Sequence, residues 1–357
     1  MMRTARLLLL PVAIIYWLVT TVRNWLYDIG ALRSRAFGKP VICVGNITVG
    51  GTGKTPIIEH LARLLSHSGL RVAVVSRGYR RKSRGQVVAE TGATAEAIGD
   101  EPCQIKRHIP EVDVIVDADR AAAIGTAIAR GADAVLMDDG MQHRSVRPGA
   151  LIMVCDYARP LWRDLPLPAG DKRESVTGRL RADVVIVNKC PRDLTKNEAE
   201  AIFRHMSLND GQKIFFSAIA YSDFTTADGA AADEAEISEL GAVAIAGIGR
   251  PEPFFTEVER RTGQTARMAF ADHHAFTTSD IAQMGKRLDE AGPDSFAICT
   301  EKDATRLPAR IGRHEVLTLP IRTEILLGEQ ARFDSLMLSL ATSERHDRKT
   351  TTQPTKA

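Results

Sequence analysis

Residues 44–55 read VGNITVGGTGKT and end like a phosphate-binding loop. The strict motif, G-x-x-x-x-G-K-[ST], requires a glycine at the position where this chain has Thr48. The preceding run, KPVICV at 39–44, is apolar and β-branched and predicts a buried strand. The following run, PIIEHLARLL at 56–65, places apolar residues at helical spacing. A strand, a glycine loop and a helix in this order predict a P-loop α/β fold built on a parallel sheet.

The loop itself predicts a nucleotide site. Its glycines allow backbone N–H groups to curl around phosphate oxygens, and the helix that follows points its dipole at the same place. We expect Lys54 to reach the β- and γ-phosphates and Thr55 to bind Mg²⁺. The alternative is a glycine turn with a chance lysine. The expected cofactor-binding residues are Thr48, Val49, Gly50, Gly51, Thr52, Gly53, Lys54 and Thr55.

Further strand-like runs follow the loop and alternate with helical stretches, which is typical of a parallel sheet covered by helices on both faces. A second set of such runs begins near residue 241 and predicts a smaller α/β domain. The segment between the two sets is rich in Ala, Asp, Ser and Thr. We therefore expect an N-terminal helix at 1–30, a kinase domain at 31–216, a second domain at 217–342 and a disordered polar tail at 343–357.

The N-terminal segment LLLLPVAIIYWLVTTV, residues 7–22, is uncharged and is flanked by Arg3, Arg6 and Arg23. Sixteen helical residues span about 24 Å, less than the roughly 30 Å of a bilayer core. A helix dipped into the membrane surface is the favoured interpretation, with tryptophans at the interface. A true span and a buried core helix are the alternatives. A signal peptide is disfavoured because no clear cleavage site follows.

Charge and cysteine content exclude several function classes. The net charge of +3 is too small to imply nucleic acid by itself, and we expect no nucleic-acid partner. The five cysteines form no C-x-x-C pair, so neither a zinc site nor an oxidising compartment is indicated. No protein partner can be inferred.

Acidic residues follow two strand-like runs. Asp138 and Asp139 come after AVLM and precede a glycine, so both carboxylates are expected at the sheet edge where ligands bind. Asp117 and Asp119 are better explained as turn or helix caps. In IGDEPCQI, residues 98–105, Asp100 is either a helix cap or a catalytic group. The cluster ADHHAFT at 271–277 and the basic run SRGYRRKSRG at 76–85 stay open between structural and ligand-binding roles.

Taken together, these segments resemble the tetraacyldisaccharide 4'-kinase family, the lipid A 4'-kinases of Gram-negative bacteria. The resemblance runs from the N-terminal apolar helix to about residue 330, and its motifs occur in the family's order. They are GNITVGGTGKTP, SRGYRR, GDEP, DDGMQHR, LPAGDKRES, AIAGIGRPEPFF, DHHAF and TEKDATRL. The family tolerates a small residue at the position of Thr48. Met141 stands where the family usually has Phe, and AGDKRES replaces the commoner A-G-P-L-R-E.

The resemblance implies ATP- and Mg²⁺-dependent phosphorylation of the 4'-hydroxyl of an acylated glucosamine disaccharide 1-phosphate. It also implies a peripheral or monotopic enzyme on the cytoplasmic face of the inner membrane. The catalytic residues it implies are Asp100, His273, Lys54 and Asp139, with Asp100 as base and His273 as its partner. The metal ligands it implies are Thr55, Asp138 and Glu174. The substrate-binding residues it implies are Arg77, Tyr79, Arg80, Gln142, His143, Arg144 and Arg173.

Two other classes of protein remain as alternatives. Membrane-associated ATPase switches of the partition and cell-division type carry lysine in K-G-G-x-G-K-T, where this chain has Val49. GTP-binding proteins read guanine with the aspartate of N-K-x-D; here VNKCPRD puts Pro191 at that position.

Overall fold

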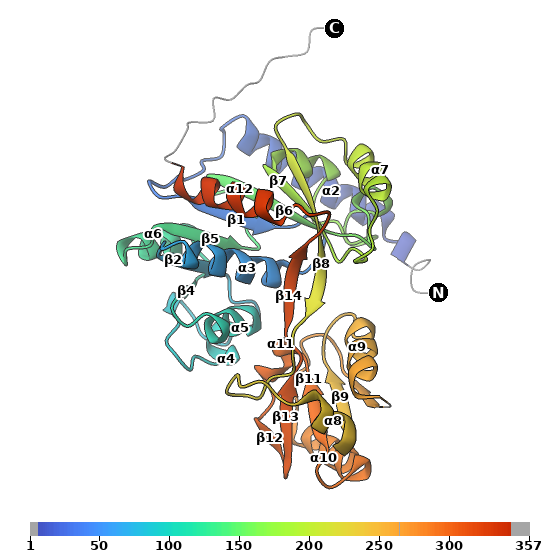
Figure 1. The fold of residues 1–357 in the computed structure, drawn as a ribbon. Coiled ribbons are helices and arrows are strands. Elements are labelled where there is room, and N and C mark those ends of the chain that lie inside the picture. The colour runs from blue at the N-terminus through green and yellow to red at the C-terminus, as the bar shows by residue number, and fades with distance from the viewer. Residues whose placement is uncertain (1–5, 264, 344–357) are drawn as a thin grey trace.

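The computed structural model describes residues 6–263 and 265–343 and contains two sheets (Figure 1). The larger sheet has nine strands in the order β14-β8-β7-β6-β1-β5-β2-β4-β3. Its strands are parallel except β3 and β14 at the two edges. The bounds are β1 (Val41–Gly45), β2 (Val72–Ser76), β3 (Val87–Val88), β4 (Asp113–Val116), β5 (Ala134–Asp138), β6 (Ala150–Asp156), β7 (Val184–Asn188), β8 (Lys213–Tyr221) and β14 (Ile321–Ile325). The predicted α/β class with a parallel sheet is confirmed.

Helices cover both faces of this sheet and bury a separate apolar cluster on each. One cluster includes side chains from α6 (Arg120–Ala129) and α7 (Lys196–Met206). The other includes side chains from α3 (Lys54–His67), α5 (Asp100–His108) and α12 (Gln330–Thr342). The central strands are therefore apolar on both sides, as the uninterrupted hydrophobic runs predicted. Shorter helical turns are α4 (Ala95–Ile98), η1 (Leu161–Arg163) and η2 (Val176–Arg181).

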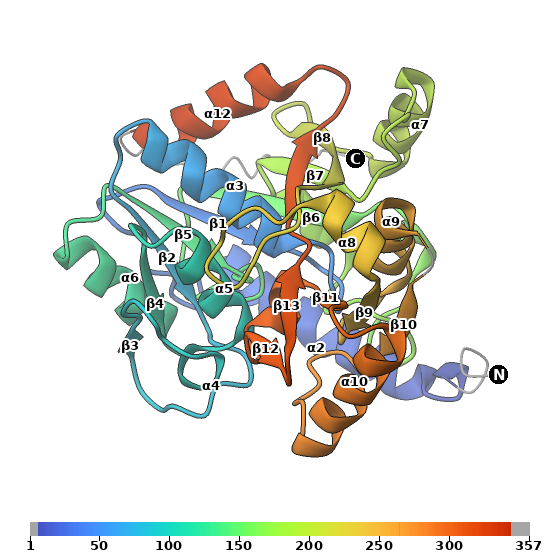
Figure 2. The same cartoon turned by 60° about the horizontal axis from the view of Figure 1, so that its bottom comes forward.

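The smaller sheet has five strands in the order β10-β9-β11-β13-β12. Helices α8 (Glu234–Leu240) and α9 (Glu252–Thr262) pack on one face and α10 (Thr278–Ala291) on the other (Figure 2). The short helix α11 (Glu301–Ala304) follows β11 directly. The strand bounds are β9 (Ala242–Ala246), β10 (Ala266–Ala269), β11 (Phe296–Cys299), β12 (Arg310–Ile311) and β13 (His314–Thr318).

The structure differs from the expected division of the chain at its C-terminal end. Strand β8 crosses the expected boundary at residue 216, and β14 returns to pair with β8 in the large sheet. Helix α12 then packs Phe333 against Phe215 of β8, with ring centroids 5.1 Å apart. Residues 321–342 therefore do not belong with the second domain, because their apolar face is buried in the core of the first. We propose a large domain of 31–222 plus 321–342 and a small domain of 223–320 inserted into it.

Helix α2 (Leu10–Asp28) lies outside both cores. Among its described residues only Ala13 is buried. This excludes the alternative of a buried core helix. Within 6–263 and 265–343, no helix combines the length and apolar character needed to cross a membrane. Arg3 and the expected disordered tail, apart from Ser343, lie outside the described residues. The exposed apolar side chains of the helix are Leu10, Val12, Ile14, Ile15, Trp17, Leu18, Val19, Val22 and Trp25.

Candidate active site

The glycine loop joins β1 to α3 and is held from two sides. Gly50 and Gly53 have positive φ, of 91° and 85°, whereas Thr48 is not among the described residues with positive φ. A glycine is therefore not required at position 48. Backbone bonds fix the first half of the loop, since Val49 N donates to Asp171 O at 2.7 Å and Arg173 N donates to Ile47 O at 2.8 Å.

The second half of the loop is held by the last residue of β7 and the residue that follows it. Asn188 Nδ2 donates to Thr52 O at 2.9 Å, and a Cβ on Gly53 would lie 2.2 Å from that nitrogen. Gly53 is thus fixed both by its conformation and by close approach. Lys189 donates to the carbonyl of Gly51. The N-K pair of VNKCPRD therefore supports the phosphate loop, a role that the sequence did not reveal.

Asp138 and Asp139 lie at the carboxyl end of β5, next to the loop strand β1, where Val44 pairs with Asp138. Asp138 is buried and accepts a hydrogen bond from Ser76 Oγ at 3.2 Å. Burial and the neighbouring Asp139 charge raise the pKa of Asp138 to about 7. A buried carboxyl at this end of the strand is suited to a cation.

Asp139 has a positive φ of 47° and faces two cations. Lys54 Nζ lies 3.2 Å and Arg173 Nη1 2.9 Å from its carboxylate oxygens. Burial raises the pKa of Asp139, but Lys54 and Arg173 outweigh this effect and hold it below its usual value. Asp139 is therefore ionised and fixes Lys54 at the loop.

Asp100 is the first residue of α5, and its partners come from the small domain. His273 Nδ1 lies 2.8 Å and Arg306 Nη1 3.7 Å from Asp100 Oδ2. Burial raises the pKa of Asp100, but the hydrogen bond from His273 and the charges of Arg306 and Lys302 bring it below its usual value. The capping alternative is wrong, because the N-cap of α5 is Gly99.

The hydrogen bonds of His273 define its protonation. Lys302 Nζ lies 2.8 Å from His273 Nε2. An ammonium group can only donate, so Nε2 accepts and Nδ1 carries the proton given to Asp100. His273 is thus a neutral donor to Asp100, rather than the imidazolium that an ion pair would require.

Several of the expected substrate-binding residues surround these groups. Arg80 stacks on Tyr79 and donates to His273 O at 3.2 Å, and the Tyr79 ring meets the His273 ring edge-on. Burial lowers the pKa of His143, and the charges of the buried Arg120 and of Arg77 add to this effect. Arg173 contacts Asp139, as described. Together with the exposed Arg77, Tyr79 and Arg80, the half-buried His143 and Arg173 form a basic and aromatic rim beside Asp100 and Asp139.

Other expected residues instead support helix α2. Arg144 donates to Asn24 O at 2.8 Å and pairs with Asp28 at 2.7 Å. Gln142 Nε2 donates to Asn46 O and to Glu174, each at 2.8 Å. Gln142 Oε1 also accepts a hydrogen bond from Arg173 Nη1 at 3.4 Å, so Gln142 lies next to the rim, whereas Arg144 contacts α2.

Glu174 was expected as a metal ligand, and in the structure its carboxylate is engaged by neighbouring side chains. Its carboxylate is 2% exposed and pairs with Arg181 at 2.8 Å. It also accepts hydrogen bonds from Gln142 and from Asn24 Nδ2 at 2.7 Å. With its oxygens occupied in this way, Glu174 is a structural anion between α2 and the loop.

Within the described parts of the chain, no three His, Cys, Asp or Glu side chains are placed to hold a metal ion. Mg²⁺ at P-loop sites is bound by one or two protein oxygens together with the nucleotide phosphates. Thr55 and the buried carboxyl of Asp138 fit that arrangement. Sequence reasoning missed Ser76, Arg120, Lys302 and Arg306, although the last two lie in the quoted TEKDATRL segment.

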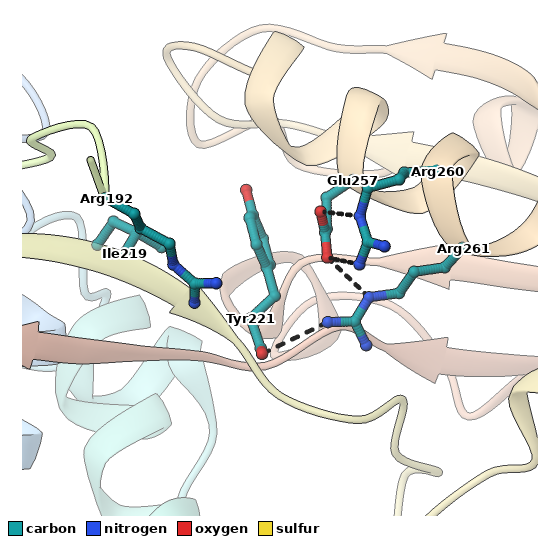
Figure 3. Close-up of a pocket in the computed structure, with 6 residues that line it drawn as sticks. All are labelled: Arg192, Ile219, Tyr221, Glu257, Arg260 and Arg261. Carbon is teal, nitrogen blue, oxygen red and sulfur yellow. Dashed lines mark hydrogen bonds and ion pairs between the residues drawn. The ribbon is translucent and has the colours of Figure 1, made fainter.

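A separate pocket of about 450 Å³ lies where β8 meets α9 (Figure 3). Its arginines are already occupied, since Arg260 and Arg261 each lie 2.8 Å from Glu257 and Arg192 pairs with Glu324 at 3.3 Å. This pocket is distinct from the residues described above.

The parallel sheet, the glycine loop with its lysine and the ionised carboxylate held across the two domains define a P-loop phosphotransferase. Over residues 5–342 the chain matches the family described as tetraacyldisaccharide-1-P 4'-kinase, LpxK. The chain belongs to this family.

Individual relatives agree with the family match. The chain is 40% identical over 344 residues to tetraacyldisaccharide 4'-kinase of Porphyromonas gingivalis W83, covering 92% of this chain and 96% of that one. It is 41% identical over 349 residues to tetraacyldisaccharide 4'-kinase of Bacteroides thetaiotaomicron, covering 91% and 90%. A crystal structure of "apo" form LpxK from Aquifex aeolicus in complex with ATP superposes with a TM-score of 0.74 at 27% identity, covering 96% and 100%.

Proposed function

We propose that the protein transfers the γ-phosphoryl group of ATP to the 4'-hydroxyl of a tetraacyldisaccharide 1-phosphate, a step of lipid A biosynthesis. The observation that carries this function is the ionised Asp100, oriented by His273, in a protein that also presents a P-loop lysine. Family membership favours this kinase over an ATPase switch. A guanine site is disfavoured because Pro191 replaces the base-reading aspartate, and Asn188 is engaged with the loop.

The phosphate side of the reaction uses the loop. Lys54 neutralises charge that develops on the transferred group, and the N–H groups of Gly50 to Thr55 hold the phosphates. Thr55 and Asp138 would hold Mg²⁺ together with the nucleotide, and the ion would supply positive charge that neutralises the phosphates. Arg173 keeps Asp139 ionised, so that Asp139 in turn positions Lys54.

The acceptor side uses Asp100. Its carboxylate takes the proton of the sugar hydroxyl as the new oxygen–phosphorus bond forms and the bond to the β-phosphate oxygen breaks, releasing ADP. His273 orients this carboxylate through Nδ1–H, and Lys302 fixes the tautomer of His273. The basic rim of Arg77 and Arg80 suits the anionic 1-phosphate of the acceptor.

Helix α2 supplies the membrane contact. Its polar side docks on the large domain through Tyr16, Arg23 and Asn24, which bond to residues 142, 173 and 174. Its apolar side is exposed, with Ile15 and Val19 more than 60% accessible. We place this side in the cytoplasmic leaflet of the inner membrane, where the acyl chains of the substrate need not enter water. Moving them out would cost about 0.8 kcal/mol per CH₂.

A direct assay tests this function. The protein is incubated with labelled ATP and tetraacyldisaccharide 1-phosphate in detergent micelles, and a bisphosphorylated lipid is the expected product. Lys54→Ala should abolish transfer while the protein stays folded, and GTP should not replace ATP. Lipid-independent ATP turnover without a phosphorylated lipid would instead support the ATPase switch.

A further inference from the structure

Helix α5 of the large domain and helix α11 of the small domain lie against each other and are joined at both ends of α5 (Figure 1). At the first residue of α5, Asp100 binds His273, which accepts a hydrogen bond from Lys302 of α11. At the last residue, His108 Nε2 lies 3.2 Å from Glu301 Oε1, on the first residue of α11. The place of Lys302, and with it the orientation of His273, therefore depends on the contact at the far end of α5.

His108 also contacts the helix that follows the P-loop. Its Nδ1 lies 3.0 Å from Oε1 and 3.1 Å from Oε2 of Glu59 on α3. Glu59 is 2% exposed and accepts a further hydrogen bond from Gln104 at 3.0 Å. One imidazole ring thus bridges two carboxyl groups, one from the nucleotide-binding helix and one from the small domain. The mechanism above uses none of the three.

The bridge requires two protons. A ring nitrogen and a carboxyl oxygen bind each other only with a proton between them. With both carboxylates ionised, His108 must be an imidazolium. With Glu301 protonated, a neutral ring that donates to Glu59 and accepts from Glu301 makes the same contacts. After loss of one proton, the Nε2 lone pair would face the Glu301 carboxylate and the contact would become repulsive.

The surroundings favour the two-proton state. Burial lowers the pKa of His108, but the hydrogen bond with Glu59 and the charges of Glu59 and Glu301 outweigh burial and raise it above its usual value. Burial raises the pKa of Glu301 to about 7; the charge of His108 opposes this rise and that of Glu59 adds to it. Arg63 is the further charged group that faces the cluster, and it opposes protonation of both. The amide of Ile321 donates to the other Glu301 oxygen at 3.1 Å.

We propose that His108 is a positioning residue, which holds α11 in place by bridging Glu59 and Glu301 and thereby keeps Asp100 and His273 aligned across the two domains. The bridged state binds its protons more tightly than a separated state does. It is therefore complete at acidic pH and is lost as the pH rises through neutrality. The catalytic part of this inference rests on the proposed role of Asp100, whereas the pH-dependent contact between the domains does not.

Two variants separate the bridge from general stability. His108→Ala removes it. Glu301→Gln mimics protonated Glu301, because its amide can donate to His108 Nε2 while its oxygen still accepts from Ile321 N. This variant should keep the bridge at alkaline pH. His67→Ala, at the exposed end of α3, is the matched control.

The first readout does not depend on activity. The five native cysteines are buried, so spin labels can be attached at Ala122→Cys on α6 and Lys286→Cys on α10, which are both exposed. We expect the distribution of distances between the two labels to broaden from pH 6.5 to pH 9 in the otherwise native chain. The distribution should not broaden in the chain that carries Glu301→Gln. His108→Ala should show the broad distribution at both pH values.

The second readout is lipid phosphorylation. His108→Ala should lower kcat about tenfold near pH 7 with little change in KM for ATP, as is typical of coupling between sites. The native enzyme should lose kcat toward pH 9 relative to Glu301→Gln, and His67→Ala should follow the native profile. If the native chain and Glu301→Gln show the same kcat and the same label distances at pH 9, the proposal is wrong. This comparison does not depend on whether His108→Ala folds. A native protein that phosphorylates no lipid would refute the proposed function, and the label distances would still decide on the bridge.

Discussion

Asp100 and Asp138 are both largely buried carboxyl groups, yet their surroundings move their pKa values in opposite directions. Asp100 faces His273, Lys302 and Arg306 and stays ionised. Asp138 has Asp139 beside it, and its pKa rises to about 7. Carboxyl groups whose pKa values are shifted in opposite directions are typical of sites in which the two groups have different roles, here base and metal ligand.

At Asp100 the test is replacement by Asn, which keeps the shape but cannot take a proton. We expect a folded, ATP-binding protein whose kcat is lower by roughly 10²–10⁴. His273→Ala should also lower kcat, and the double variant should lose less than the sum of the two effects. Retention of more than about a tenth of native kcat, with chemistry shown to be rate-limiting, would contradict the role of base.

The pH dependence on the acid side should come from Asp138. Because the pKa of Asp100 lies below its ordinary value of 3.8, the base remains ionised down to that region. Protons instead compete with Mg²⁺ for Asp138 below about pH 7. Rates measured at pH 6 and pH 8 over a Mg²⁺ series should show a higher Mg²⁺ requirement at pH 6, and kcat at saturating Mg²⁺ should be no lower at pH 6 than at pH 8. An acid loss of kcat that persists at saturating Mg²⁺ would point to the base.

Among the elements, α2 has a polar side that docks on the large domain and an exposed apolar side that we propose contacts the membrane. Its polar side contacts Arg144 and Glu174, and Glu174 also bonds to Gln142 beside the loop strand. Removing the whole helix would therefore disturb the large domain as well as the proposed membrane attachment. Substitutions confined to the exposed side separate the two effects.

Ile15→Asp combined with Val19→Asp places two charges one turn apart on the exposed face of α2. We expect the thermal midpoint to stay close to native and binding to anionic vesicles to fall by at least about tenfold, since each buried apolar side chain contributes roughly 1.5–3 kcal/mol. Vesicle sedimentation measures this, with Lys196→Glu on α7 as the control for an added negative charge. Unchanged sedimentation would show that another surface carries the attachment.

At the scale of the whole molecule, β14 and α12 stabilise the large domain, although they follow the small domain in the sequence. A prediction that assigns elements to domains in chain order overlooks this contribution. Phe333 is fully buried against Phe215. Phe333→Ala should lower the free energy of unfolding by about 3–5 kcal/mol, the cost of a large cavity. Phe203→Ala, which removes a 47% exposed ring, should change it by less than about 0.5 kcal/mol. Denaturant titration of both variants measures the difference, and equal effects would exclude α12 from the core.

The glycine loop, Asp138 and Asp139 were predictable because strand, loop and helix follow one another locally. The pairing of Asp100 with His273 joins residues 173 positions apart and was available only through family resemblance. Lys302 and Arg306 were missed for the same reason, since their roles exist only when the small domain meets α5. The contacts of Glu174 could not be predicted, because sequence cannot show that Arg181, Gln142 and Asn24 bind its oxygens.

The insertion of the small domain between β8 and β14 has a consequence for synthesis. Its two ends meet on adjacent antiparallel strands, where Tyr221 pairs with Ile321 and Ser222 N donates to Pro320 O at 2.9 Å. The small domain is complete before residue 321 is translated. The large sheet, in contrast, lacks its edge strand β14 and its covering helix α12 until residues 321–342 have left the ribosome. The nascent chain therefore holds a complete small domain before it can close its nucleotide-binding domain, so the small domain can fold first.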